Sequence, residues 1–176
     1  MNYLKCLISL TLLFHFSCSN FNSSSLKELS DLEYKISLDK KKISHFKTYQ
    51  TKKKLELAKN NFLLLESMRL DSIAFELIYF KYKDYLDCVN NINSYVEIIE
   101  ILSEELKKNE IQLSNLIKEY QSSRGPRLDL NFHVETEKKL TESTSEKINE
   151  LQINLKMENL RFDSLNHSIE KIINAE

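Results

Sequence analysis

Apolar residues recur at alternating steps of three and four positions through the middle of the chain. The positions met in this way are Tyr82, Tyr85, Val89, Ile92, Val96, Ile99, Ser103, Leu106, Glu110, Leu113, Ile117 and Tyr120. All of them except Ser103 and Glu110 are apolar or aromatic, which is the period of a helix with one buried seam. The pattern therefore predicts a long amphipathic helix over about residues 70–122.

The C-terminal part of the chain has the same period, with a more polar beginning. Its seam positions are Val134, Glu137, Thr141, Thr144, Ile148, Leu151, Leu155, Glu158, Phe162, Leu165, Ile169 and Ile172. We expect a second long helix over about residues 133–174. Before it stands Gly125-Pro126, where proline cannot continue a helix and glycine suits a left-handed helix end. A chain reversal between the two helices follows.

The first amphipathic segment keeps its period less regularly. Its apolar positions share one register as far as Phe46, and they are Leu29, Leu32, Ile36, Ile43 and Phe46. The register falters through the polar residues 47–54 and resumes at Leu55. The step from Phe46 to Leu57 is 11 residues, and a local unwinding of the seam would keep the helix continuous across it. The sequence therefore predicts one helix over about residues 26–66.

A second chain reversal is expected near residue 68. Without it, the apolar run at 62–65 would lie bare unless a partner chain covered it, as in a homo-oligomer formed through the helical seam. No residue between 66 and 72 breaks a helix, although Asp71 or Ser72 offers a helix cap, so a continuous helix is the alternative. The preferred fold is all-α, an elongated antiparallel bundle or coiled coil of three long helices in one domain, 26–176.

Composition agrees with a helical fold. The chain has one Gly and one Pro in 176 residues, far below the usual ~7% and ~5%. Of three cysteines, only Cys88 lies within the expected helical domain, so no internal disulfide is expected there. A formal net charge of −1 gives no general attraction to nucleic acid.

The N-terminus combines a positive charge with a short apolar run. Lys5 precedes an uncharged stretch from Cys6 to Phe16, and Ser17-Cys18 follows it. Basic start and apolar run together are typical of a secretory signal peptide. The run is shorter than the roughly 20 apolar residues of a membrane-spanning helix.

This segment resembles a bacterial lipoprotein precursor, in which a small residue precedes an acylated cysteine. The resemblance implies a signal peptide over 1–17, cleavage before Cys18 and attachment of palmitate and related acyl chains to it. It also implies a flexible tether over 18–25 and a place on the cell envelope, most often the outer membrane. His15 and Phe16 depart from the residues usual in this family. An uncleaved anchor and a secreted protein without lipid are the alternatives.

Catalytic motifs are not found in the sequence. A single glycine excludes the phosphate-binding and dinucleotide-binding loops, which need several. His45, His133 and His167 are not spaced as metal ligands on one helix face. We therefore expect no enzyme activity, no cofactor and no metal.

Two clusters are candidates for an interaction surface. One is a basic stretch with aromatic residues between its lysines, which are Lys40, Lys41, Lys42, Lys52, Lys53 and Lys54. Such a stretch suits an anionic surface, but it is also what the solvated face of a bundle helix looks like. The other is aromatic, and its seam-side members are Tyr79, Tyr82 and Tyr85. Packing inside the bundle is the alternative for these tyrosines.

These observations favour a membrane-anchored helical protein that binds another protein at the bacterial envelope or surface. In general character alone, the helical part resembles small helical surface lipoproteins. A structural spacer or scaffold of the envelope is the alternative. A periplasmic holdase or lipid-binding module is a weaker one, suggested by apolar residues on several sides of the helix at 73–80.

Overall fold

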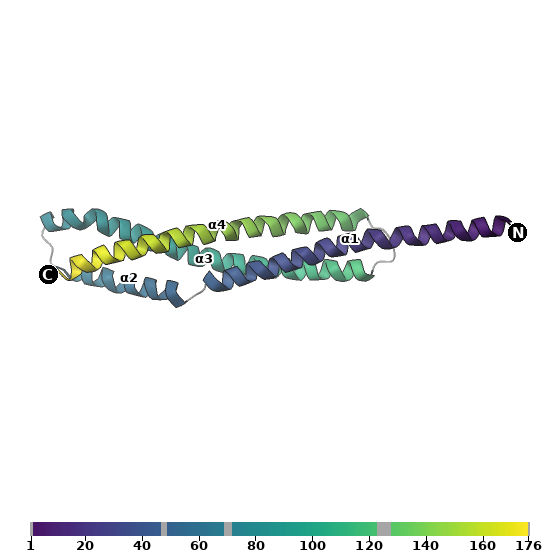
Figure 1. Ribbon diagram of the computed structural model, residues 1–176. Helices are drawn as coiled ribbons and strands as arrows, with labels where there is room; N and C mark the ends of the chain where they lie inside the picture. The colour runs from purple at the N-terminus through teal and green to yellow at the C-terminus, as the bar shows by residue number, and fades with distance from the viewer. Residues whose placement is uncertain (1, 47–48, 69–71, 123–127, 176) are drawn as a thin grey trace. The chain divides into compact units, whose positions relative to one another are not determined.

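The computed structural model describes residues 2–46, 49–68, 72–122 and 128–175, and side chains within 24–46, 51–68, 78–122 and 131–175 and at Glu76. Four helices make up almost all of this part of the chain (Figure 1). They are α1 (Asn2–Phe46), α2 (Tyr49–Ser67), α3 (Ser72–Ser122) and α4 (Leu128–Ile173). The described residues contain no strand, and the prediction of an all-α helical bundle is confirmed.

The helices form two compact units. The first unit consists of Met1–Lys40 and Glu104–Ser145, and the second consists of Lys41–Ser103 and Glu146–Glu176. Both α3 and α4 therefore contribute one part to each unit, while α2 belongs to the second unit alone.

Three helices pack together in the first unit. Its buried apolar residues come from α1, α3 and α4, and they include Leu29, Leu32, Ile36, Leu106, Leu113, Tyr120 and Val134. Glu28 contacts Lys138 and Asp39 contacts Ser145, so α1 and α4 run parallel. Tyr120 contacts Asn131, which lies close beyond the reversal, so α3 and α4 run antiparallel.

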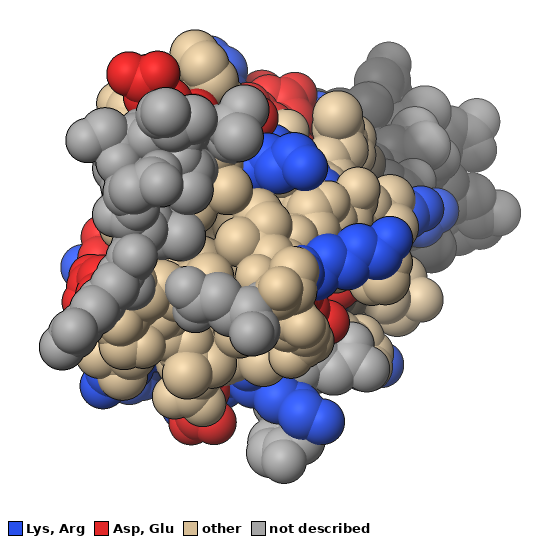
Figure 2. Space-filling model, turned by 90° about the vertical axis from the view of Figure 1, so that its left-hand side faces the viewer, with Lys and Arg blue, Asp and Glu red and all other residues tan. Residues whose placement is uncertain are grey.

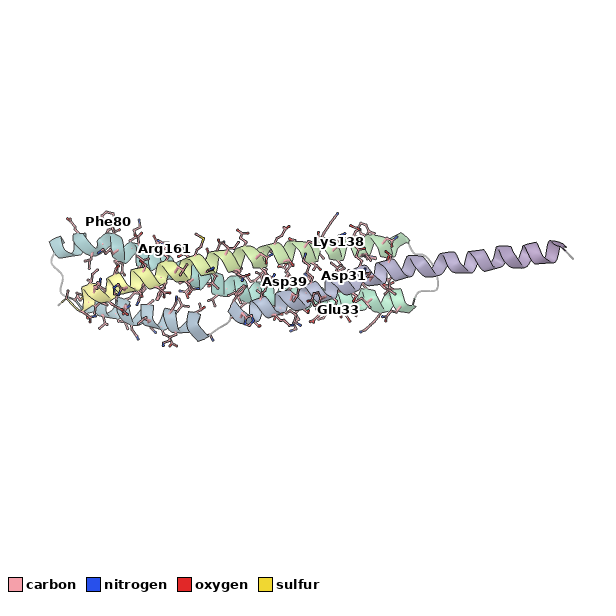
Figure 3. All side chains as sticks on the ribbon, in the orientation of Figure 1. Asp31, Glu33, Asp39, Phe80, Lys138 and Arg161 are labelled. Atoms are coloured by element: carbon pink, nitrogen blue, oxygen red, sulfur yellow. The ribbon has the colours of Figure 1, made fainter. Side chains whose placement is uncertain are left out.

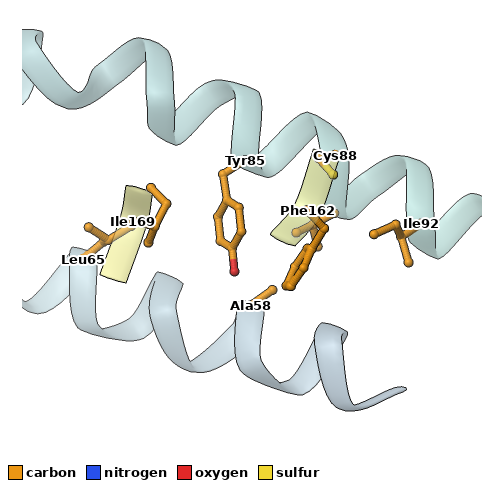
Figure 4. Close-up of a cluster of buried hydrophobic side chains, with 8 residues drawn as sticks. Ala58, Leu65, Tyr85, Cys88, Ile92, Phe162 and Ile169 are labelled. Carbon is orange, nitrogen blue, oxygen red and sulfur yellow. The ribbon is translucent and has the colours of Figure 1, made fainter. Parts of the chain in front are cut away.

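The second unit repeats this arrangement with α2 in the place of α1. Its core contains Ala58, Leu65, Tyr85, Cys88, Val89, Ile92, Phe162 and Ile169 (Figure 4). Asn61 bonds to Asn166 of α4 and to Tyr85 of α3. Because α3 returns antiparallel to α2, the chain reverses between Ser67 and Ser72, and the alternative of one continuous helix is wrong.

The predicted first helix over 26–66 is divided in the structure. Helix α1 ends at Phe46 and α2 begins at Tyr49, and residues 47–48 lie outside the described part. The division falls where the register falters in the sequence. Most residues from 47 to 54 are polar in the sequence, so the apolar stripe before Phe46 is not continued directly into the one that resumes at Leu55.

The buried face of α3 also differs from the predicted seam at alternate positions. The structure buries Leu102 and Asn109, whereas the predicted seam residues Ser103 and Glu110 are only half-buried. The physical reason is that α3 packs against two other helices in each unit. Its buried face is therefore wider than the seam between two helices, and at these two positions it includes the residue before the predicted one. This shift brings the apolar Leu102 into the core in place of Ser103, and Asn109 in place of Glu110.

The predicted lipid anchor lies outside the described side chains. Residues 1–23, with Cys18 among them, have no described side chain, and the expected tether 18–25 falls within the bounds of α1. No helix within the described residues has the length and apolar character needed to cross a membrane. The signal peptide, the acylation and the tether stay predictions.

Candidate interaction surface

A groove of the second unit lies between α2 and α4, and His45 and Phe46 at the end of α1 also line it. It contains two hollows of about 410 and 420 Å³. The first lies beside Thr51 and Leu160, and the second lies beside Leu57 and His167. Figure 2 views the second unit from the left-hand side of Figure 1, where basic side chains stand over a largely uncharged surface. We call the surface between α2 and α4 that contains both hollows the α2–α4 groove.

A single lysine divides the groove. The ammonium of Lys54 is 2.7 Å from a carboxylate oxygen of Asp163, and both residues line both hollows. The same ammonium donates to the carbonyl of Asn159 at 3.0 Å and lies 5.4 Å from the centre of the Phe162 ring. Lys54 therefore joins α2 to α4 and covers part of the core with its stem.

Other groove residues remain open to solvent. Lys53 and Lys156 are exposed and form no ion pair within the described part of the chain. Leu57 and Leu160 expose apolar surface at the rim. Apolar side chains and unpaired cations therefore lie together along one groove, a combination that suits a partner with apolar and acidic groups.

Helix α4 carries an apolar stripe on its outer side. Ile153, Met157 and Leu160 are 60%, 64% and 64% exposed. Their spacing of four and then three residues places them on one helix face. A solvated helix face is normally polar, so three large apolar side chains in successive turns are unusual there. We call these residues the outer stripe of α4. Their spacing is visible in the sequence, but they lie outside the predicted seam and were not predicted as a contact site.

A hydrogen-bonded cluster crosses the core beneath the groove. The hydroxyl of Tyr85 and the amide of Asn61 both donate to Asn166 Oδ1, each at 2.8 Å. Asn61 also donates to the Tyr85 hydroxyl at 3.3 Å, and Asn166 donates to Glu170 Oε1 at 2.8 Å. Burial raises the pKa of Tyr85 to about 12, against the opposing effect of the Asn61 hydrogen bond. This polar cluster stays neutral at its tyrosine and fixes how three helices align.

Cys88 is a buried core residue. Its thiol donates weakly to the carbonyl of Glu158, with a sulfur–oxygen distance of 3.5 Å. Burial, together with the neighbouring Glu158, raises the pKa of the Cys88 thiol to about 12. Because the thiolate is the reactive form, this side chain acts as a small core residue.

The first unit has its own polar layer. Thr144 donates to Glu105 Oε1 at 2.8 Å and accepts from Asn109 at 3.2 Å, while Ser145 donates to Asp39. These contacts join α3 to α4 and α4 to α1. They explain why the polar first third of the predicted C-terminal seam still packs.

The predicted lysines differ in their surroundings. Lys40 belongs to the first unit, where its ammonium is 2.8 Å from Glu110. Lys42 donates to the side-chain oxygen of Asn149 at 2.9 Å, and Lys54 is half-buried as described above. The remaining members are exposed, and they are Lys41, Lys52 and Lys53. Only Lys53 and Lys54 line the groove.

The predicted tyrosines divide between core and surface. Tyr85 is fully buried, and Tyr82 is half-buried with its ring 5.6 Å from that of Phe62. Tyr79 is exposed and contacts Phe80, which points away from the helices (Figure 3). Packing inside the bundle therefore accounts for Tyr82 and Tyr85.

No cluster of three or more potential metal ligands occurs among the side chains that the structure describes. Comparison with known proteins finds no matching family model, no matching curated protein and no matching solved structure.

Proposed function

We propose that this chain is a lipid-anchored helical protein of the bacterial cell envelope that binds another protein through exposed apolar residues of its second unit. The observation that carries this proposal is the outer stripe of α4. Its three side chains lie on one face in successive turns, as do the anchor residues of helix-to-helix recognition. Single exposed apolar residues are common on protein surfaces, whereas an ordered stripe marks a contact site.

The anchor complements this contact face. Acyl chains on Cys18 would hold the chain at the membrane surface and so raise the local concentration of chain and envelope partner relative to each other. A contact of modest affinity is then sufficient, which agrees with a stripe of three residues rather than a large apolar patch. The core polar cluster and the buried thiol supply alignment and packing, and they leave the outer residues to bind.

The proposal is tested by photocrosslinking in cells. A photoreactive amino acid at position 157 of the whole anchored chain should crosslink to one or a few envelope proteins. The same group at Lys83, an exposed residue of α3 in the same unit, is the matched control and should not capture them. Adding Cys18→Ala should release the chain from the membrane and reduce the yield of the crosslinked product from position 157. Capture of the same proteins from both positions, or of none from position 157, would contradict the proposal.

A further inference from the structure

We propose that the α2–α4 groove receives an acidic amphipathic helix of the partner protein. This inference rests on the proposed function, because it names the kind of segment by which the partner is held. It is carried by three features of the groove: two hollows with shared lining residues between parallel helices, the apolar side chains at its rim and the unpaired cations beside them.

The length of the groove fits one helix. Along α4, its lining runs from Gln152 in the first hollow to Glu170 in the second. At 1.5 Å per residue this distance is about 27 Å, or roughly five helical turns. The ion-paired residues Lys54 and Asp163 belong to the linings of both hollows. A helix lying over that pair would reach both hollows.

The apolar contacts come from both walls. Leu57 exposes its side chain from α2, and Leu160 exposes its side chain from α4. A helix in the groove would contact both with residues spaced three or four apart. Ile153 of the outer stripe lies two turns before Leu160 on the same face, so it extends the contact along α4.

The charged residues of the groove favour an acidic partner. The groove is lined by three lysines and two acids, which are Lys53, Lys54, Lys156, Asp163 and Glu170. Asp163 is paired with Lys54, and Glu170 accepts a hydrogen bond from Asn166. Lys53 and Lys156 are left without an acidic partner among the described side chains. Acidic residues flanking the apolar face of a bound helix would pair with these two.

A concave site favours a helix over a lipid surface. Hollows of about 410 and 420 Å³ lie between the walls, so the apolar residues meet a convex object that enters the groove.

Selection from a displayed peptide library tests the inference. The library is an amphipathic helix with fixed leucines at i, i+4, i+7 and i+11, and with flanking positions varied among Glu, Gln and Lys. The target is the whole chain held in vesicles of neutral phosphatidylcholine. Selected peptides should be enriched in Glu, and their binding should weaken at least about tenfold on Leu57→Ser with Leu160→Ser.

Charge reversal makes the test sharper. Lys53→Glu with Lys156→Glu should change the preference of the library from Glu to Lys. The matched control, Lys83→Glu with Lys108→Glu, changes two exposed lysines of α3 outside the groove lining and should keep the preference for Glu.

Three results would overturn the inference. They are selection without charge preference, binding that survives loss of both leucines, and groove-dependent binding of vesicles with anionic lipid or of a second copy of the chain in place of the peptides. Crosslinking from position 157 decides the proposed function independently. If that crosslink forms and the library shows no preference for Glu, the inference fails while the proposed function stands.

Discussion

Replacing Phe162 with alanine is expected to lower the free energy of unfolding by about 3–5 kcal/mol. Phe162 is 1% exposed and lies in the core of the second unit (Figure 4). Its ring centre is 5.5 Å from that of Tyr85 and 5.4 Å from the Lys54 ammonium. Truncation removes these contacts and leaves a cavity between helices that the Lys54–Asp163 pair holds in place.

Phe132→Ala is the matched control for this change. Phe132 lies on the same helix and is 70% exposed, so its loss should change the free energy of unfolding by less than about 0.5 kcal/mol. Urea denaturation followed by circular dichroism measures both variants. Equal effects of the two substitutions would mean that α4 does not bury the predicted seam in the second unit.

Replacing Asn166 with alanine is expected to destabilise the chain by about 2 kcal/mol. The substitution removes the acceptor of the Tyr85 hydroxyl and of the Asn61 amide, both of which are buried. A buried polar group that loses its partner costs about 1–3 kcal/mol, and the remaining bond between Asn61 and Tyr85 limits the loss. Asn159→Ala is the control, since Asn159 donates only within its own helix.

Removing the whole cluster should have a different result. Asn61→Leu, Tyr85→Phe and Asn166→Leu together leave no buried amide or hydroxyl of this cluster unpaired, so most of the lost stability should return. A buried polar contact also specifies helix alignment, and its removal should broaden the set of helix registers. Urea denaturation measures the first effect, and distances between spin labels on α2 and α4 measure the second. A triple variant as unstable as Asn166→Ala would contradict this account of the cluster.

The spacing of apolar residues by three and four predicted most of the fold, because buried residues recur at that spacing along a long helix. Ile99, Leu106, Leu113 and Tyr120 are seam residues in the sequence and buried residues in the structure. The spacing of three and four residues identifies one buried stripe along a helix. It does not show on which side of that stripe a second helix packs. For this reason the burial of Leu102 and Asn109 was not predicted.

Polar residues limited the prediction of the site. The sequence pattern did not single out Asn61 and Asn166, because only the meeting of three helices gives them partners. The lysines were a candidate interaction surface in the sequence, with the solvated face of a bundle helix as the alternative. The structure instead turns Lys54 to Asp163 and Lys40 to Glu110, which are more than 60 positions away in each case. The outer stripe of α4 was available to sequence reasoning, provided that apolar residues outside the seam are counted as well.

Partner binding by the outer stripe of α4 is tested most directly by one affinity measurement. The partner captured at position 157 is titrated against the anchored chain and against its Ile153→Ser, Met157→Ser and Leu160→Ser variant. All three residues are exposed, so the free energy of unfolding should stay within about 0.5 kcal/mol while the affinity falls at least about tenfold. Unchanged affinity in this variant would contradict the account.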